Sequence, residues 1–323
     1  MRTPVSWLIP VRDGAQWLGE AVRSALADSH PHDEVVVVDD GSRDDPASAL
    51  PDDPRVRLVV QPPSGIVAAL EHGRRLARAP YIARLDCDDL SLPGRLDAQV
   101  AALDAEPRLA VVGGRALSDG LPEGMRRYVE WVNGLSDLHR EILVESPLFH
   151  PGTLIRAAAL ADVGGYRQGD FPEDYDLWLR LAVGWRLGAV AHDVVAWRDR
   201  PGRLTRTDPR YARPAFASIK RAYVRDAVLR QPARVVVWGA GQEGTPWVRW
   251  LVGEGHTVVA ALDIKPGTTR HGVPIVSPEA LPGLSFERLF VAVGARGARD
   301  EIRARIADMR PDLSEGRDWW AVA

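Results

Sequence analysis

The chain has 323 residues, of which 46% are hydrophobic and 26% are charged, and its formal net charge is −3 at pH 7. This balance gives no electrostatic reason to expect nucleic acid or an anionic membrane as the main partner. The single cysteine, Cys87, excludes an intramolecular disulfide and a zinc site built from several cysteines.

The length of the chain favours two domains rather than one. No apolar run approaches the ~18 residues that are needed to cross a bilayer. The first apolar run also stops too early, before Asp13, to be the core of a signal peptide. We therefore expect a cytoplasmic protein.

The first forty residues have the pattern of a strand, a helix and a second strand. Residues 5–9 are apolar and are expected to form a strand that Pro10 ends, and apolar residues at helical spacing follow over 17–25. A run of valines then stops at Asp39 and Asp40, which is typical of a parallel strand covered on both faces. Ligands bind beyond the carboxyl ends of such strands, so this acidic pair marks a candidate site.

The same alternation continues to about residue 210. Further strands are expected at 56–60, 81–85 and near 109, and helices at 65–78, 96–103, 135–145, 157–162 and from 173 onward. This order predicts an α/β fold with a mostly parallel sheet flanked by helices.

The stretch YIARLDCDDL holds Asp86, Asp88 and Asp89 around Cys87. If the strand continues to Asp88, the side chains of Arg84, Asp86 and Asp88 share one face. Cys87 then points into the apolar layer, where free cysteine is common. Such acids either end a strand as turn formers or hold Mg²⁺ or Mn²⁺. Three crowded carboxylates repel one another without a cation, which favours the metal site.

Two other acidic pairs leave both a structural and a functional interpretation open. Glu173 and Asp174 open a helix, where the helix dipole stabilises acids, but a carboxylate there can also act as a general base. Asp39 and Asp40 either form a strand-to-loop turn or accept hydrogen bonds from a base or a ribose.

In their order and spacing, these segments resemble glycosyltransferase family 2, inverting enzymes with the GT-A nucleotide-sugar fold. The resemblance covers about residues 4–210 and rests on IPVRDG, EVVVVDDGS, YIARLDCDDLSLPGRLDAQ, HPGTLIR, GGYR and EDYDLWLRL. It implies transfer of a sugar from a nucleotide diphosphate sugar, with UDP-sugars favoured, to a hydroxyl of a carbohydrate or glycolipid. It further implies a role in cell-surface polysaccharide or glycoconjugate synthesis, with peripheral association to a membrane-bound acceptor.

The resemblance also implies the residues of the donor site. The nucleotide sugar would be bound by Pro10, Asp39, Asp40, Arg84 and Asp86. Mn²⁺ or Mg²⁺ would be bound by Asp86 and Asp88, with Asp89 in support.

On the acceptor side, the resemblance makes Asp174 the catalytic base and Glu173 its neighbour. His150 falls in a segment that resembles the family's HP segment near the acceptor, although a lone histidine is more often structural. The reaction would be a single displacement that inverts the anomeric carbon without a covalent intermediate.

Some features depart from the pattern of the family. Glu71 and His72 stand where many relatives carry an asparagine, and the Gln-x-x-Arg-Trp mark of processive synthases is absent from the sequence, so we expect transfer of single sugars. Arg198, Arg203 and Arg206 can reach a phosphate, but the Arg/Pro-rich stretch at 197–214 favours a solvated connector between domains.

A second, Rossmann-like α/β domain is expected at 225–323, which leaves 1–224 to the first domain. Its predicted elements are a strand before Gly239, a helix through Trp247 and Leu251, further strands at 257–263 and 288–294, and a helix at about 297–309. Gly239, Gly241 and Gly244 lie between a strand and a helix, where backbone amides can hold a phosphate, and Asp263 has the spacing of a ribose-binding acid. Glycines also serve tight strand-to-helix turns. We interpret the domain as nucleotide-binding, regulatory or dimerising, with NAD(P) as a less favoured ligand.

Two other functions remain as alternatives at this point. One is an NAD-dependent sugar-nucleotide oxidoreductase whose activity lies in the second domain. The lack of an evident hydride-transfer constellation in the sequence argues against it. The other is a non-catalytic nucleotide-sugar sensor. The presence of both Asp88 and Asp174 argues against it.

Overall fold

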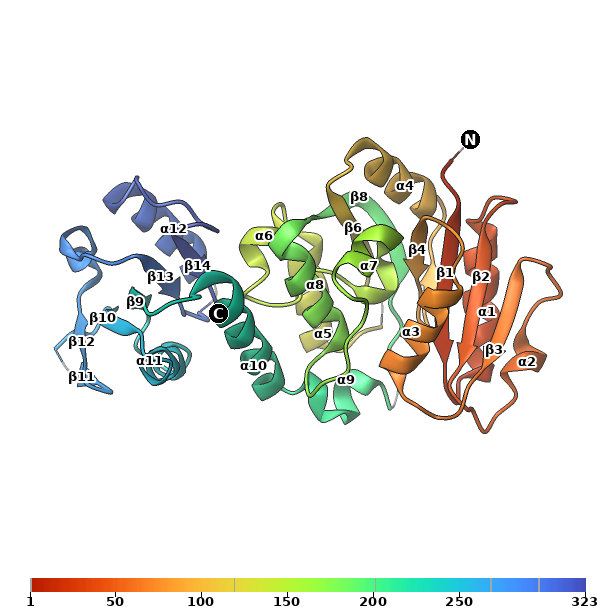
Figure 1. The fold of residues 1–323 in the computed structure, drawn as a ribbon, viewed down its shortest axis with the longest axis horizontal. Coiled ribbons are helices and arrows are strands. Elements are labelled where there is room, and N and C mark those ends of the chain that lie inside the picture. Colours follow the sequence, from red (N-terminus) through yellow and green to blue (C-terminus); the bar gives the residue numbers. More distant parts are fainter. Residues whose placement is uncertain (1, 119, 201, 268, 296) are drawn as a thin grey trace. The chain divides into compact units, whose positions relative to one another are not determined.

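The computed structural model describes residues 2–118, 120–200, 202–267, 269–295 and 297–323 (Figure 1). The chain forms two compact units. The first comprises the described residues up to Leu138 together with Pro147–Ile219, and the second comprises His139–Ser146 together with the described part of Lys220–Ala323. The sequence did not predict that a short internal segment joins the second unit.

The first unit is built on a mixed sheet with the strand order β3-β2-β1-β4-β7-β6-β8-β5. Strands β1 to β4 are parallel to their neighbours among themselves, and β7 is antiparallel to both β4 and β6. The bounds are β1 Val5–Val11, β2 Glu34–Asp39, β3 Val56–Val60, β4 Tyr81–Arg84, β5 Leu90–Ser91, β6 Leu109–Leu117, β7 Leu154–Arg156 and β8 Arg186–Ala196. The expected α/β fold is confirmed.

Helices cover both faces of the parallel strands, which explains their continuous apolar sequences. Trp7 and Ile9 of β1 pack with Leu18 of helix α1. Leu8, on the opposite face, lies against Gly73 of helix α3, where an added Cβ would come within 2.0 Å of the leucine side chain. The alternation therefore buries every residue of β1.

The helices of this part of the chain are α1 Ala15–Ala27, α2 Pro46–Ala49, α3 Ile66–Leu76, α4 Arg95–Ala105, α5 Glu123–Asn133, α6 Leu138–Glu141, α7 Ala157–Asp162, α8 Glu173–Gly184, α9 Leu204–Thr207 and α10 Arg213–Tyr223. The helices expected at 17–25, 65–78, 96–103, 157–162 and from 173 onward are present, whereas α2, α5, α9 and α10 were not predicted. The prediction of a helix at 135–145 is wrong, because the long helix of this region is α5, which ends at Asn133. Pro122 precedes its first turn and Gly134 ends it, which leaves only the short α6 in the predicted range.

Pro10 does not end the first strand, which continues to Val11. Leu8 turns its carbonyl toward β4 and accepts a hydrogen bond from Leu85 N–H at 3.2 Å. Residue 10 faces the same side as residue 8, and β4 has already ended there, at Arg84. The missing N–H of proline therefore costs no ladder bond, and the strand is tolerated.

The strand that leads into the acidic stretch ends earlier than predicted. β4 stops at Arg84, and the chain turns so that Asp89 N–H bonds to Asp86 O at 3.2 Å. Cys87 is nevertheless buried in the apolar core, where its sulfur would lie 2.9 Å from a Cβ added at Gly14. The predicted burial of the thiol is confirmed, but a turn and not strand alternation produces it.

The second unit contains a smaller sheet with the order β11-β12-β10-β9-β13-β14. Its bounds are β9 Arg234–Trp238, α11 Gly244–Gly253, β10 Thr257–Leu262, β11 Thr269–Arg270, β12 Val273–Val276, β13 Arg288–Val291, α12 Ala298–Met309 and β14 Trp319–Ala321. The strand-to-helix order from β9 to β10 and the helix near 297–309 follow the prediction. Strands β11, β12 and β14, which are short, were not predicted.

An ionic cluster attaches the internal segment to this second unit. Arg303 of α12 bonds Glu141 at 2.5 Å and Glu315 at 3.0 Å, and Arg140 also pairs with Glu315 at 2.7 Å. Lys220 donates to the carbonyl of Val144. These bonds explain why 139–146 belongs to a unit whose main part lies much later in the chain. Among the described residues, no helix has the length and apolar character that a membrane span requires.

Candidate functional site

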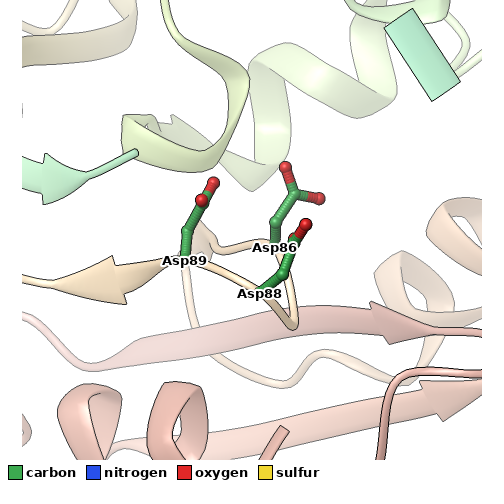
Figure 2. A group of neighbouring side chains, drawn as sticks. All are labelled: Asp86, Asp88 and Asp89. Carbon is green, nitrogen blue, oxygen red and sulfur yellow. The ribbon is translucent and has the colours of Figure 1, made fainter. Parts of the chain in front are cut away.

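Three carboxylates cluster on the turn that follows β4. Asp86, Asp88 and Asp89 each offer an oxygen, and these oxygens all lie within 4.8 Å of one another. Figure 2 shows the three side chains on the same side of the turn. Asp88 and Asp89 are buried, and Asp86 is half-buried. We call these three residues the acidic triad.

Each member of the acidic triad has a different partner. Asp86 pairs with Arg84 at 2.6 Å, and Asp88 pairs with Arg200. One oxygen of Asp89 accepts the backbone N–H of Arg198 at 2.8 Å. Its second oxygen, Oδ2, is buried without a hydrogen-bond partner in the described part of the chain. A buried carboxylate oxygen without a partner is costly, so this atom is suited to a ligand.

The electrostatics differ across the acidic triad. Burial raises the pKa of Asp89 well above its ordinary value, and the nearby charge of Asp86 adds to this effect. Burial also acts to raise the pKa of Asp86, but Arg84 and Arg203 outweigh it and hold that pKa below its ordinary value. Burial raises the pKa of Cys87 as well, so this residue remains a thiol and offers no thiolate to a metal.

The donor set of the acidic triad fits a hard divalent cation. Carboxylate oxygens suit Mg²⁺ and Mn²⁺, whereas a neutral thiol does not. Asp89 contributes the buried oxygen that lacks a partner. It is therefore a potential third ligand, beyond the supporting role expected from the sequence.

The Arg/Pro-rich stretch is not a solvated connector, and that prediction is wrong. Its described residues from 197 to 211 fold back on the first unit, and we call them the arginine strap. Arg198 donates from Nε to the carbonyl of Asp88 at 2.6 Å, and Arg203 lies 4.0 Å from Asp86. Local composition suggested solvent, but the unmatched charge of the acidic triad attracts these cations.

Two aromatic rings support the arginine strap. The guanidinium of Arg200 lies 4.8 Å from the ring centroid of Trp17, and that of Arg203 lies 4.6 Å from that of Trp197. Arg206, by contrast, pairs with Asp199 of the same segment at 2.8 Å. Arg200 and Arg203, which lie close to the acidic triad, are therefore held by stacking as well as by charge.

A second acidic pair opens helix α8, directly after Pro172. Burial and the neighbouring charge of Glu173 raise the pKa of Asp174, which is half-buried, to about 7. Glu173 is buried, and its Oε2 accepts a hydrogen bond from the hydroxyl of Tyr211 at 2.6 Å. Burial raises the pKa of Glu173 too. A carboxyl group that titrates near neutral pH is suited to proton transfer.

Arg84 links the two groups of carboxylates. It is 3% exposed, pairs with Asp86 at 2.6 Å, and its charge also acts to lower the pKa of both Glu173 and Asp174. Such an influence requires that Arg84 lie near the start of α8. We therefore treat the acidic triad and the acids of α8 as one candidate site in the first unit.

His150 lies at the edge of this site. Its Nε2 is 2.8 Å from the hydroxyl of Tyr166, and its Nδ1 is 4.0 Å from Oε1 of Glu173. Burial, followed by the charge of Arg84, holds the pKa of His150 well below its ordinary value. The imidazole is therefore neutral. It lies beside Glu173, and its role on the acceptor side stays a prediction.

The unusual pair at 71–72 has structural partners. Glu71 accepts the backbone N–H of Tyr166 at 2.7 Å and bonds Arg74 at 2.9 Å. Nδ1 of His72 lies 2.8 Å from Oε1 of Gln61. The departure from the family pattern thus holds the loop before α8 and the loop after β3.

Asp39 and Asp40 lie together at the end of β2, and both are buried. Asp40 accepts bonds from Gln61, Ser64 N–H and Gly65 N–H, each at 2.8 Å. One oxygen of Asp39 accepts Ser42 N–H at 2.9 Å. Asp40 therefore holds the loop at 61–65, and Asp39 makes fewer bonds within the protein.

In the second unit, the glycine-rich turn has packing reasons for its residues. Gly239 has φ of 117°, and a Cβ there would lie 2.4 Å from the carbonyl of Ala292. A Cβ at Gly244 would lie 1.8 Å from the carbonyl of Gly239, whereas Gly241 has open space. Asp263 accepts Ala240 N–H at 2.9 Å and so holds this turn. A phosphate site at this turn remains a prediction.

Three residues of the site in the first unit were not predicted from the sequence. Tyr166 and Tyr211 bond His150 and Glu173, and Arg200 pairs with Asp88. The GGYR and Arg/Pro-rich segments were the only sequence signals for them. Their contacts join positions 16, 38 and 112 residues apart, and a local sequence pattern does not reveal such contacts.

The mixed sheet with acids at its strand ends defines the first unit as a GT-A fold, the fold of nucleotide-sugar enzymes. A mannosyltransferase structure from Pyrobaculum calidifontis, in complex with GDP-Man and Mn²⁺, aligns over 70% of this chain and 70% of its own, with a TM-score of 0.55 and 19% identity. Residues 6–164 match the model of glycosyl transferase family 2. Through this domain, the chain belongs to glycosyltransferase family 2.

Curated relatives are similar over the same part of the chain. An uncharacterized glycosyltransferase of Rickettsia conorii is 30% identical over 189 residues, which are 55% of this chain and 31% of the relative. The amylovoran biosynthesis glycosyltransferase AmsE of Erwinia amylovora is 27% identical over 154 residues, 46% of this chain and 58% of the relative. The match thus spans between about a third and three fifths of each relative.

Proposed function

We propose that this protein is a metal-dependent, inverting glycosyltransferase. The donor is a nucleotide diphosphate sugar, with UDP-sugars favoured, and the acceptor is a hydroxyl of a carbohydrate or glycolipid in cell-surface polysaccharide or glycoconjugate synthesis. One observation carries the proposal: within a family 2 domain, Arg84 pairs with Asp86 of the acidic triad, and its charge also acts on Asp174, whose pKa burial raises to about 7.

The acidic triad holds the donor end of the reaction. Asp86, Asp88 and the free oxygen of Asp89 would hold Mn²⁺ or Mg²⁺, and the ion would supply positive charge that offsets the charge of the departing nucleoside diphosphate. Asp39 binds the nucleotide, and Asp40 shapes the loop around it through Ser64 and Gly65.

Asp174 is the general base of the proposed reaction. Its carboxylate takes the proton of the acceptor hydroxyl while the acceptor oxygen bonds to the anomeric carbon. The bond from that carbon to the phosphate oxygen breaks, and its electron pair leaves with the diphosphate. Attack from the face opposite the leaving group inverts the carbon, and Glu173 and His150 line the acceptor side.

The test is a screen of UDP-, dTDP- and GDP-sugars for slow hydrolysis in the presence and absence of Mn²⁺. Wild type is compared with Asp88→Ala and Asp174→Asn, and Asp170→Asn, which changes an exposed acid before the same helix, is the control. We expect metal-dependent turnover of one donor that both site variants lose. Donor turnover that ignores both Mn²⁺ and Asp88→Ala would refute the metal assignment.

A further inference from the structure

The acidic triad already has a positively charged partner, Arg200. Nε of Arg200 pairs with Oδ2 of Asp88, and the side chain of Arg200 is 26% exposed. Asp88 itself is buried, so this pair is shielded from water on one side only. An arginine at this place neutralises the carboxylate in the same way as a metal ion would.

Further contacts hold Arg200 in place beside Asp88. Trp17 lies under its guanidinium, with 4.8 Å between that group and the ring centroid. The preceding Arg198 ties the chain to the acidic triad through Asp88 O at 2.6 Å and Asp89 Oδ1 at 2.8 Å, and to Glu20 of α1 at 2.7 Å. The arginine strap is thus fastened just before the residue that reaches Asp88.

We propose that Arg200 is a counter-ion that a divalent cation must displace from Asp88. Metal binding and release of the arginine strap are then a single coupled event. The inference rests on the proposed metal site and adds to it a competitor within the chain. The physical reason is that Oδ2 of Asp88 cannot serve Arg200 and a metal ion at full strength together, because like charges repel at that distance.

The coupling is reciprocal by thermodynamic necessity. If Arg200 weakens metal binding, metal binding weakens the hold of Arg200 on Asp88 by the same factor. Loss of Arg200 leaves Asp88 without its counter-charge and strengthens its attraction for Mn²⁺. Pairs with one buried partner typically exceed surface pairs in strength, so we expect Mn²⁺ to bind about tenfold tighter in Arg200→Ala.

The experiment titrates Mn²⁺ alone into the full chain and follows free Mn²⁺ by electron paramagnetic resonance. The variants are Arg200→Ala and Trp17→Leu, which removes the ring under Arg200 and should tighten Mn²⁺ binding by about threefold. Arg206→Ala is the control, because Arg206 pairs with Asp199 and not with the acidic triad. It should bind Mn²⁺ as wild type does.

A second measurement keeps the inference testable if Arg200→Ala folds poorly. Limited trypsin digestion of wild type should cut faster after Arg198 and Arg203 when Mn²⁺ is added. Trp17→Leu should be cut fast without metal.

Two failures are distinguishable. Equal Mn²⁺ affinity in wild type, Arg200→Ala and Trp17→Leu overturns the counter-ion while the metal site stands. Mn²⁺ binding that is absent from all of them, or unchanged by Asp88→Asn, overturns the metal site and the inference together.

Discussion

The hydroxyl of Tyr211 donates a hydrogen bond to Oε2 of Glu173 at 2.6 Å and so joins the end of the arginine strap to the first turn of α8. Glu173 neighbours Asp174, and its charge is one of the causes that raise the pKa of Asp174. Arg200 of the same strap pairs with Asp88. The arginine strap therefore contacts both the acidic triad and the acidic pair that opens α8.

Replacement of Tyr211 by phenylalanine should destabilise the first unit. The buried carboxylate of Glu173 would lose its bond, which costs about 1–3 kcal/mol of the free energy of unfolding. Urea unfolding of Tyr211→Phe, Glu173→Ala and the double variant measures the coupling. Strictly additive effects would mean that the bond contributes nothing in solution.

Asp174→Asn should lower sugar transfer by about 10²- to 10⁴-fold, because the amide cannot accept the proton of the acceptor. The variant should remain folded, since the amide replaces a carboxyl that burial already disfavours in its charged form. Asp170→Asn is the matched control and should keep wild-type rates. Transfer by Asp174→Asn at the wild-type rate would remove this residue as the base.

The pKa of Asp174, raised to about 7, sets the direction of two pH profiles. The transfer rate should fall about tenfold per pH unit below that value and level off above it, because only the ionised form is a base. The folded protein binds the proton more tightly than the unfolded chain does. The stability contributed by this group is therefore full below the unfolded pKa and is lost as pH rises through about 7.

These profiles are checked with wild type and Asp174→Asn side by side. The asparagine variant should lose the stabilisation at acidic pH that urea unfolding detects in wild type. A wild-type rate profile that stays flat over roughly pH 5 to 8, the range in which such a group changes its charge, would contradict the assignment.

Cys87→Ala should spare metal binding, because the thiol is buried in the apolar core and its pKa is raised. The loss of the sulfur from a packed position should cost about 1 kcal/mol of stability. Mn²⁺ titration and thermal unfolding test both parts, with Asp88→Asn as the variant that should lose the metal. A collapse of Mn²⁺ affinity in Cys87→Ala would mean that the sulfur is a ligand.

Asp39 and Asp40 should respond differently to substitution. Asp40→Ala removes the acceptor of the Ser64 and Gly65 N–H groups and should cost about 2 kcal/mol or more of stability. Asp39→Asn should weaken nucleotide binding with a smaller loss of stability. Calorimetric titration with UDP and urea unfolding separate the two effects, and an equal loss of UDP affinity in both variants would count against the division of roles.

Most of the fold was predictable from local patterns. Apolar runs such as residues 35–38 indicate strands covered on both faces, and the helical spacing at 17–25 predicted α1. The ends of elements were less predictable: β1 passes through Pro10, and β4 stops at Arg84. Both depend on what the neighbouring strand does, which a local pattern does not contain.

The sequence by itself determined where the acids stand, at the carboxyl ends of β2 and β4 and at the start of α8, because strand and helix signals are local. Only the tertiary structure decided their partners. Arg200 and Asp88 are 112 positions apart, and Tyr211 and Glu173 are 38 apart. The composition of the arginine strap indicated a solvated segment. The charge of the acidic triad and the rings of Trp17 and Trp197 instead hold the strap on the site.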